Sequence, residues 1–323
     1  MLIWQIFKNH ITENNLVSNG DKIILAVSGG ADSIVMADLF YRLKKSMDID
    51  LTVVNFNHHL RKESVKETKL VEKFSKLRNI RFISKNLDTK NFALKNNISV
   101  ETAGRQLRYL NLTHIAKTEK YGKIATAHNM NDQAETILMW LIRGTGSEGL
   151  AGIPVSRKLD KNISVIRPLL SVSRDLIELY AKKQKLKFCT DKSNFSQDYT
   201  RNKIRLNILP ELKKINPLVN EHFFELSKII ARETAYFDKK TANFILKNVK
   251  ISKNKITVHL KSFSNSDNVI KHRILKNIMP VKKDSTHING IIKWIYSNKD
   301  AAYILNKQWI VKKNGSKISF IKK

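Results

Sequence analysis

The first two thirds of the sequence alternate short apolar runs with longer amphipathic runs, and this alternation constrains the fold more than any other feature. The apolar runs are typical of strands buried on both faces, and they lie at 23–27, 51–56, 80–84, 123–127 and around Val165 and Ile166. Runs with helical periodicity follow them, at 34–43, 63–78, 101–118, 131–142, 173–185 and 201–214. This pattern predicts an α/β fold, with a parallel sheet covered by helices on both faces.

The pattern changes at Asn216 and Pro217, because proline restricts the residue before it to extended conformations and interrupts helices. Beyond this point we expect a small, mainly helical domain that also contains a strand at 256–260 and a C-terminal hairpin turning at Asn314 and Gly315. The sequence therefore predicts two domains, residues 1–215 and residues 216–323.

The charge balance indicates an anionic partner. Of the 323 residues, 59 are basic and 28 acidic, a formal net charge of +31. Residues 206–323 carry 24 basic and 8 acidic side chains and are the more densely basic part. RNA is the natural candidate, with the second domain as a binding surface. The alternative is a solvated basic surface that reflects a biased genome composition.

Apolar run lengths and the cysteine count exclude several classes of protein. The sequence contains no apolar run long enough to cross a bilayer, and its opening stretch lacks a signal-peptide core, so we expect a cytoplasmic protein with no membrane partner. Its single cysteine, Cys189, excludes an internal disulfide, a CxxC zinc site and sulfur transfer by two cysteines within the chain.

A short glycine-containing segment, Ser28–Ser33 with the sequence SGGADS, lies between the first predicted strand and the first predicted helix after it. At such a junction the backbone amides and the helix dipole favour an anion, and glycine lets the backbone approach a phosphate closely. The segment matches neither GxxxxGK[ST] nor GxGxxG. The alternative is an ordinary glycine turn in which Asp32 caps the helix.

Two acidic residues lie at another predicted strand-to-helix junction. Asp132 and Glu135 are three residues apart, a spacing that places both carboxylates on one face of a helix, close enough to hold one cation. In a basic protein such a pair suits the selection of a free cationic amino acid. The alternative is that both are simply favourable acidic residues in a helix's first turn.

Basic residues are spread over several other motifs. Arginines beside an aromatic residue, as around Tyr109, suit phosphate contact and base stacking on RNA. The alternative for each is a solvated helix face or an inert loop histidine. The basic and histidine side chains in these motifs are His58, Arg61, Arg105, Arg108, Arg143, Arg201 and Arg205.

The ordered set of motifs resembles a known family. SGGADS resembles the PP-loop pattern SGGxDS at every fixed position, and over residues 20–210 the set resembles the bacterial tRNA(Ile)-lysidine synthetase family. Two positions depart from the family pattern, Asn129 where histidine is usual and Gly104 where alanine is usual. The motifs are SGGADS, NHHLR, ETAGRQLRY, TAHNMNDQAET, LIRGTGSEGLAGIP, RPLL, DKSN and RNKIR.

The resemblance implies a fold and a reaction. The fold is Rossmann-like, of the PP-loop (adenine nucleotide alpha hydrolase) type. The reaction uses ATP and Mg²⁺ to adenylate the C2 oxygen of the wobble cytidine in an isoleucine tRNA with a CAU anticodon. Free L-lysine then displaces AMP through its ε-amine.

The resemblance also implies residue roles. Ser28, Gly29, Gly30, Ala31, Asp32 and Ser33 would bind ATP, with Asp32 a candidate magnesium ligand. Asp132 and Glu135 would bind lysine, and together with Asp32 they are the candidate catalytic residues. The candidates for contact with tRNA or an adenylate are His58, Arg61, Arg105, Arg108, Arg143, Arg201 and Arg205.

Three other classes of protein share some of these features. A PP-loop tRNA thiolase generally relies on several cysteines, whereas this chain has one. PP-loop amidating synthetases act on soluble substrates and have no need of the basic surplus. A non-catalytic RNA-binding protein with a degenerate nucleotide fold would be expected to have lost SGGADS and the acidic pair. The sequence leaves the oligomeric state open, a homodimer included.

Overall fold

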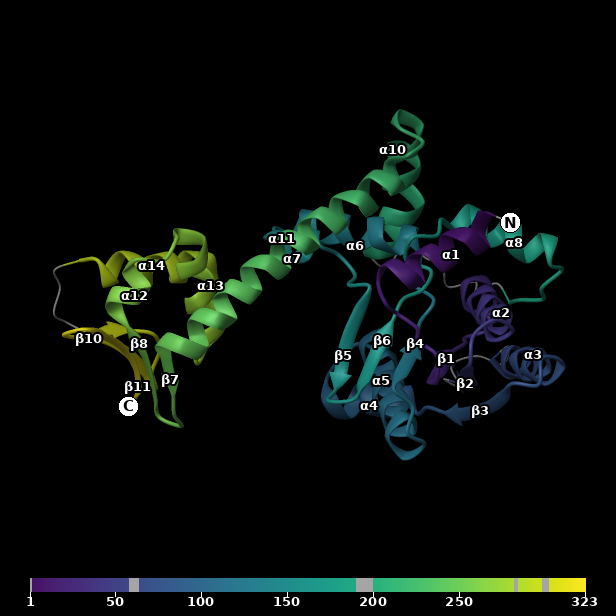
Figure 1. Cartoon of the computed structure of the whole chain (residues 1–323), viewed down its shortest axis with the longest axis horizontal. Helices are drawn as coiled ribbons and strands as arrows, with labels where there is room; N and C mark the ends of the chain where they lie inside the picture. The colour runs from purple at the N-terminus through teal and green to yellow at the C-terminus, as the bar shows by residue number, and fades with distance from the viewer. Residues whose placement is uncertain (1, 58–63, 190–199, 282–283, 298–301) are drawn as a thin grey trace. The chain divides into compact units, whose positions relative to one another are not determined.

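The computed structural model describes residues 2–57, 64–189, 200–281, 284–297 and 302–323 (Figure 1). These residues form two compact units, Met1–Ile230 and Ala231–Lys323. We call them unit 1 and unit 2 and describe each by itself.

Unit 1 is built on a six-stranded sheet with the order β3-β2-β1-β4-β6-β5. Every pairing is parallel except that of β5, which lies antiparallel to β6 at the edge. The parallel sheet predicted from the apolar runs is therefore confirmed. The strands are β1 (Asp21–Ala26), β2 (Ile49–Asn57), β3 (Arg81–Asn86), β4 (Lys123–Ala125), β5 (Ser156–Asp160) and β6 (Ile163–Ile166).

Helices cover both faces of this sheet (Figure 1). Side chains alternate along β1, so that Ile23 and Leu25 pack under α1, α2, α3 and α8, while Ile24 packs under α5. The helices of unit 1 are α1 (Leu2–Glu13), α2 (Ala31–Lys44), α3 (Ser64–Leu77), α4 (Thr89–Asn96), α5 (Val100–Thr118), α6 (Met130–Arg143), α7 (Ser147–Leu150), α8 (Arg174–Lys183), α9 (Thr200–Lys203), the π-helical turn η2 (Ile204–Ile208), α10 (Leu209–Ile215) and the first part of α11 (Val219–Asn248).

The strand order reverses between β1 and β4. From β1 the chain proceeds to β2 and β3 on one side, and β4 then pairs with β1 on the other side. In open α/β sheets ligands bind at the carboxyl ends of the strands beside such a reversal. Ser28–Ser33 follows β1 at this point, and Thr126–Asn129 follows β4.

The division between the units falls within α11, further along the chain than the boundary expected at Asn216 and Pro217. Helix α11 begins at Val219, two residues after the proline. Phe224 contacts a small apolar cluster with Met130 and Leu170, which fixes this part of α11 to unit 1.

Unit 2 combines helices with an antiparallel sheet of order β7-β8-β11-β10-β9. The predicted hairpin is confirmed as β10 and β11, which pair antiparallel on either side of Gly315. Phe263, Ile274 and Phe320 are fully buried in the core between the layers. The elements of unit 2 are the second part of α11, β7 (Val249–Ile251), β8 (Lys255–His259), α12 (Leu260–Ser264), α13 (Asn268–Ile278), α14 (Ser285–Ile295), β9 (Tyr303–Ile304), β10 (Trp309–Asn314) and β11 (Lys317–Lys322).

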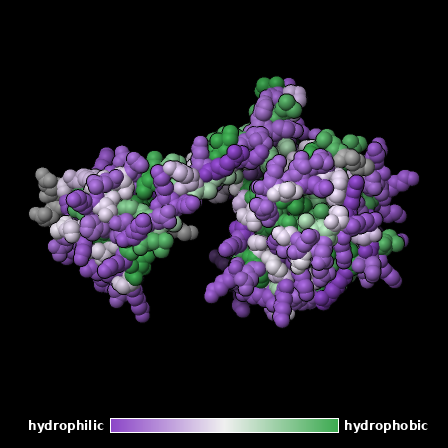
Figure 2. All heavy atoms as spheres, in the orientation of Figure 1, coloured by the Kyte–Doolittle hydropathy of each residue, from purple (hydrophilic) through white to green (hydrophobic). Residues whose placement is uncertain are grey.

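Hydrophilic residues cover most of the face of each unit shown in Figure 2. Among the described residues, no helix combines the length and the apolar character needed to span a bilayer.

Candidate active site

The loop that follows β1 is held together by one buried hydroxyl group. Ser33 Oγ accepts hydrogen bonds from the amides of Ser28 and Gly29, both at 3.2 Å, and donates to the carbonyl of Gly30 at 2.9 Å. Gly29 has a φ of +99°, a conformation that L side chains rarely adopt. Gly29 and Ser33 of the SGGADS sequence therefore determine the shape of this loop.

The first amides of α2 lie beyond this internal network. The first helical hydrogen bond runs from Ile34 to the carbonyl of Gly30, so Ala31, Asp32 and Ser33 precede the point at which amides find acceptors within the helix. The N-cap residue is Gly30, with no side-chain cap. The alternative that Asp32 merely caps the helix is therefore wrong. The amides form a helix N-terminus suited to an anion.

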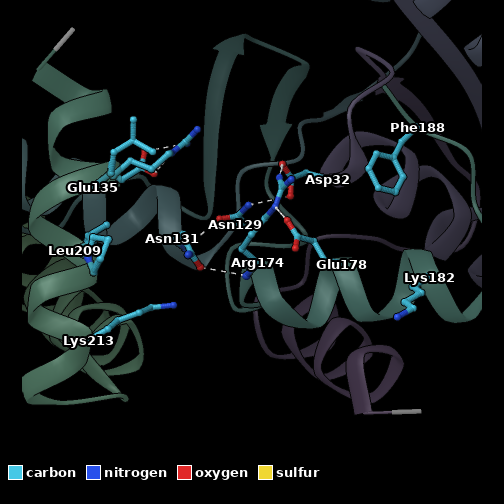
Figure 3. A pocket seen from close by; sticks show the side chains of 13 residues that line it. Asp32, Asn129, Asn131, Glu135, Arg174, Glu178, Lys182, Phe188, Leu209 and Lys213 are labelled. Carbon is cyan, nitrogen blue, oxygen red and sulfur yellow. Dashed lines mark hydrogen bonds and ion pairs between the residues drawn. The ribbon is translucent and has the colours of Figure 1, made fainter. Parts of the chain in front are cut away.

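Asp32 lies where the N-termini of α2, α6 and α8 meet (Figure 3). Its carboxylate accepts a hydrogen bond from Asn129 Nδ2 at 3.1 Å and forms an ion pair with Arg174. Asn131 Oδ1 in turn accepts from the Arg174 amide at 3.1 Å and so links α6 to α8. Burial raises the pKa of Asp32 above its usual value, and the nearby Asp132 carboxylate adds to this, while Arg174 opposes it.

The predicted acidic pair lies on one face of α6, and both members contact the same arginine. Arg201 Nε donates to Glu135 Oε2 at 2.7 Å, and its Nη2 donates to Asp132 Oδ1 at 2.8 Å. Arg205 Nε donates to Glu135 Oε1 at 2.6 Å. Burial opposes the charge of Arg201, but Asp132 and Glu135 outweigh this effect and raise its pKa.

The alternative role of Asp132, a favourable acidic residue in the first turn of a helix, also holds. Its Oδ2 accepts from the Asn129 amide at 2.9 Å, while Asn129 Oδ1 accepts from the Asp132 amide at 3.1 Å, and this reciprocal pair is a capping box. Asp132 thus orients α6 and still presents its other oxygen to the site. We call the three acidic residues and their arginine partners the paired cluster: Asp32, Asp132 and Glu135 with Arg174, Arg201 and Arg205.

A second group of cationic side chains surrounds Tyr109 and His128. The guanidinium groups of Arg105 and Arg157 lie 5.2 and 5.4 Å from the centre of the Tyr109 ring. Arg167 is 2% exposed, and burial lowers its pKa. Across the described ranges, the ion pairs include none between a carboxylate and an arginine of this group. We call it the basic cluster: Arg105, Arg108, Arg157 and Arg167 with Tyr109 and His128.

Burial and nearby arginines lower the pKa of His128. The pKa is about 3, and the largest cause is the removal of the ring from solvent. The smaller causes are the positive charges of Arg167, Arg105, Arg201 and Arg108. Its Nδ1 lies 3.1 Å from Thr126 Oγ1, a contact that a neutral ring can make. His128 is therefore neutral at pH 7, and an anion bound among the arginines would raise its pKa.

A cavity of about 780 Å³ opens on the paired cluster. Asp32, Asn129, Glu135 and Arg205 line one part of it, and α8 and the segment after it supply another part with Lys182 and Phe188 (Figure 3). Leu206, Leu209 and Pro210 add an apolar wall. Charged groups facing an apolar wall suit a ligand with a polar and a nonpolar portion.

The glycine-dense loop after α6 is anchored to that helix. Gln133 is 2% exposed, and its Oε1 accepts from the Ile153 amide at 2.6 Å while its Nε2 donates to Ser227 Oγ at 2.8 Å. Gly152 has a φ of +65° and lies so close that a Cβ atom there would be 2.7 Å from the Gln133 side chain. The loop conformation therefore depends on Gln133, a residue without a predicted role.

The structure brings most of the predicted site residues together, with three exceptions. Arg143 is exposed in the last turn of α6, three turns beyond Asp132, and is not part of either cluster. His58 and Arg61 lie outside the described residues. Arg174 and Asn131 were not predicted, because their partners are far away in sequence; the serine N-cap before Arg174 indicated only a helix start.

Comparisons with known proteins agree with this architecture. A family model described as a PP-loop domain matches residues 4–212. Among solved structures, the U34-tRNA thiolase of Methanococcus maripaludis, described with its [4Fe-4S] cluster, superposes with a TM-score of 0.60 at 21% identity, covering 70% of this chain and 79% of that chain. A likeness at this identity supports the fold alone.

Curated relatives are more similar in sequence. The tRNA(Ile)-lysidine synthase of Thermosipho africanus is 41% identical over 67% of this chain and 49% of its own length. That of Clostridium acetobutylicum is 34% identical over 88% and 62%, and that of Petrotoga mobilis is 39% identical over 70% and 71%. The aligned region is thus about half of the first relative and more than two thirds of the last. The chain belongs to the tRNA(Ile)-lysidine synthase family of PP-loop proteins.

Proposed function

We propose that this chain attaches L-lysine to C2 of the wobble cytidine in an isoleucine tRNA with a CAU anticodon, at the expense of ATP. The observation that carries the proposal is the meeting of two sites at one edge of the sheet: the loop Ser28–Ser33 after β1 and the acidic pair Asp132 and Glu135 after β4. One suits a phosphate chain and the other a cationic amino acid.

In the first step the C2 oxygen of the cytidine attacks the α-phosphorus of ATP, and pyrophosphate leaves. Phosphoryl and nucleotidyl transfers depend mainly on positioning and on neutralisation of charge. In our proposal the amides of Ala31, Asp32 and Ser33 hold the phosphate chain. Arg105 and Arg108 contact the tRNA or the adenylate, because their charges have no carboxylate partner within the described residues.

The residues around Asp32 fit a magnesium ion. Mg²⁺ usually takes one or two carboxylates and completes its coordination with water and substrate phosphates. Asp32 supplies one carboxylate, and Asp132 is near enough to raise its pKa. When bound, Mg²⁺ would neutralise phosphate charge.

In the second step the ε-amine of lysine attacks C2, and AMP leaves with the bonding electrons. We propose that Asp132 and Glu135 hold the lysine for this attack. The pKa of about 3 makes His128 a weak proton acceptor, so we do not propose it as the base that removes a proton from the amine. We propose no other residue of this chain for that role.

Unit 2 is the proposed additional tRNA-binding surface. It carries 21 basic and 5 acidic residues between 231 and 323. Such a density of positive charge favours binding to the phosphate backbone. Because the proposed substrate is tRNA, we also propose that the protein acts in the cytoplasm.

The direct test is incubation of the full chain with Mg-ATP, labelled lysine and unmodified CAU-anticodon isoleucine tRNA. We expect ATP-dependent label that survives mild alkali, a treatment that removes aminoacyl esters. The control is Asp132→Asn, which should lose lysine attachment and still release pyrophosphate in the presence of the tRNA. Absence of stable label with active tRNA and ATP binding would refute the lysine assignment.

A further inference from the structure

The carboxylates proposed to hold lysine already accept hydrogen bonds from two guanidinium groups. Glu135 Oε1 accepts from Arg205 Nε at 2.6 Å, and Glu135 Oε2 accepts from Arg201 Nε at 2.7 Å and from Arg205 Nη2 at 3.1 Å. Asp132 Oδ1 accepts from Arg201 and Oδ2 from the Asn129 amide. Guanidinium groups thus take three of the roughly four acceptor sites of Glu135, so an ammonium group that makes more than one hydrogen bond to Glu135 must displace one of them.

The two arginines differ in how they hold the pair. Arg201 bridges Asp132 and Glu135 with two short bonds. Arg205 bonds closely to Glu135 alone, since its nearest approach to Asp132 is 3.5 Å. Arg205 is also the one that lines the cavity, together with Glu135. A ligand that enters from the cavity therefore meets Arg205 first.

The acceptor, Glu135, lies on a well-anchored helix, whereas the donor, Arg205, lies in an irregular helical turn. Glu135 has a side chain that is 1% exposed, on a helix pinned by a capping box and by Gln133. Arg205 is 37% exposed and belongs to η2, the π-helical turn between α9 and α10. Such turns occur frequently at functional sites, because they interrupt the regular hydrogen-bond register of a helix.

We propose that Arg205 is an internal stand-in for the substrate cation, which lysine must displace from Glu135, while Arg201 remains as the permanent counter-ion. This inference rests on the proposed function and adds a determinant of lysine affinity. Two carboxylates and two guanidinium groups balance in charge without lysine. When lysine arrives, its ammonium group takes the place of the Arg205 guanidinium, and the balance at the carboxylates is preserved.

The displacement has a consequence for selectivity. An amino acid of the same length with an uncharged side chain, such as L-norleucine, cannot replace the charge that Arg205 withdraws, so it would leave the buried Glu135 Oε1 without a donor and with Arg201 as the sole guanidinium partner of Glu135. The stand-in therefore penalises uncharged ligands and lowers the affinity for lysine at the same time. The displacement of Arg205 thus increases selectivity for lysine over uncharged amino acids at the expense of affinity for lysine.

The test is calorimetric titration of L-lysine into the full chain and into Arg205→Gln, with Arg201→Gln as the matched control. Removal of the competitor should tighten lysine binding to Arg205→Gln by about tenfold, the scale expected from one partly exposed charged pair. Arg201→Gln keeps Arg205 on Glu135, so lysine must still displace Arg205, and lysine binding should tighten much less than in Arg205→Gln. Weaker or unchanged binding in Arg205→Gln would overturn the proposal.

A second measurement needs no substitution. Hydrogen exchange of the wild-type chain should become faster in residues 200–208 when lysine binds, because η2 loses its ionic contact with α6. Slower or unchanged exchange there would contradict displacement. If the wild-type chain and both variants bind Mg-ATP but none binds lysine, the proposed function itself fails, an outcome distinct from lysine binding without displacement.

Discussion

The paired cluster and the basic cluster lie in the same unit and contain many of the same residue types, yet their charges are arranged in opposite ways. In the paired cluster each carboxylate has an arginine partner, as for Asp32 with Arg174 and Glu135 with Arg201 and Arg205. In the basic cluster Arg105 and Arg157 flank an aromatic ring, and His128 is held neutral.

The difference indicates what each region needs from its ligands. A region whose acids are already paired can accept a cation only by exchange, so its ligands compete with the protein's own arginines. A region of unpaired cations repels itself and is relieved by an anion. Lysine and magnesium would belong to the first region, and phosphate groups of tRNA or of an adenylate to the second.

The largest expected effect comes from removing the buried acid of the paired cluster. Glu135→Gln leaves Asp132 as the sole carboxylate for both Arg201 and Arg205, and loss of one partner of a buried pair costs about 3–5 kcal/mol. We expect lysine attachment to fall by about two to three orders of magnitude. Because both arginines are about a third exposed, we expect the unfolding free energy to fall by only about 2 kcal/mol.

The control for this variant is Glu178→Gln. Glu178 lines the same cavity and pairs with Arg174, but its side chain is 56% exposed. Its loss should change the stability measured by urea unfolding by no more than about 0.5 kcal/mol. Equal effects of the two substitutions would contradict the distinction between buried and exposed acids in this site.

A smaller effect should follow from removing one charge of the basic cluster. Arg108→Gln should weaken tRNA binding by about tenfold and reduce the slope of log K against log salt concentration by about one. Filter binding at several salt concentrations measures both. Lys117→Gln, at the other end of α5, removes the same charge outside the cluster and should have a much smaller effect. If the two substitutions weaken binding equally, the basic cluster has no special role.

The pH dependence of stability reports on the same cluster. His128 has a pKa of about 3 in the folded chain and about 6.5 when unfolded, so between these values the unfolded state binds more protons and stability rises with pH. The expected slope due to this group is at most about 1.4 kcal/mol per pH unit. His128→Asn should flatten the unfolding free energy below pH 6.5, measured with urea. Identical slopes in both proteins would contradict the low pKa.

The sequence predicted the fold of unit 1 well, because its parallel strands are continuous apolar runs and its helices have clear periodicity. Edge strand β5 was not predicted. Its residues, SRKLD, have no apolar run, since an antiparallel edge strand is only half covered. Unit 2 was expected to be mainly helical with a strand at 256–260 and a C-terminal hairpin, which correspond to β8, β10 and β11, whereas the short strands β7 and β9 were not predicted.

The site was predicted in part. The loop Ser28–Ser33 and the pair Asp132 and Glu135 are local patterns, so spacing alone could identify them. The pairing of Glu135 with Arg201 and Arg205 joins residues 66 and 70 positions apart, and that of Asp32 with Arg174 spans 142. No local pattern encodes such contacts. Arg201 and Arg205 were expected to contact tRNA or the adenylate, and only the folded chain reveals that they neutralise the acidic pair.

A small effect on the stability of the unliganded chain is expected for Asp32. Its pKa is raised on folding, so the folded state holds the proton more tightly, and stability falls as the pH rises through the ordinary value near 4. At pH 7 the ionised carboxylate therefore costs stability, partly offset by Arg174. Asp32→Asn should leave the unfolding free energy of the unliganded chain unchanged or up to about 1 kcal/mol higher. The same variant should lose the stabilisation by Mg-ATP, about 2.7 kcal/mol at a hundredfold excess over Kd. A loss of more than about 1 kcal/mol without ligand would instead show that the Asp32–Arg174 pair stabilises the fold. The arginines of the paired cluster would then serve to stabilise the folded chain and not to exchange with bound cations.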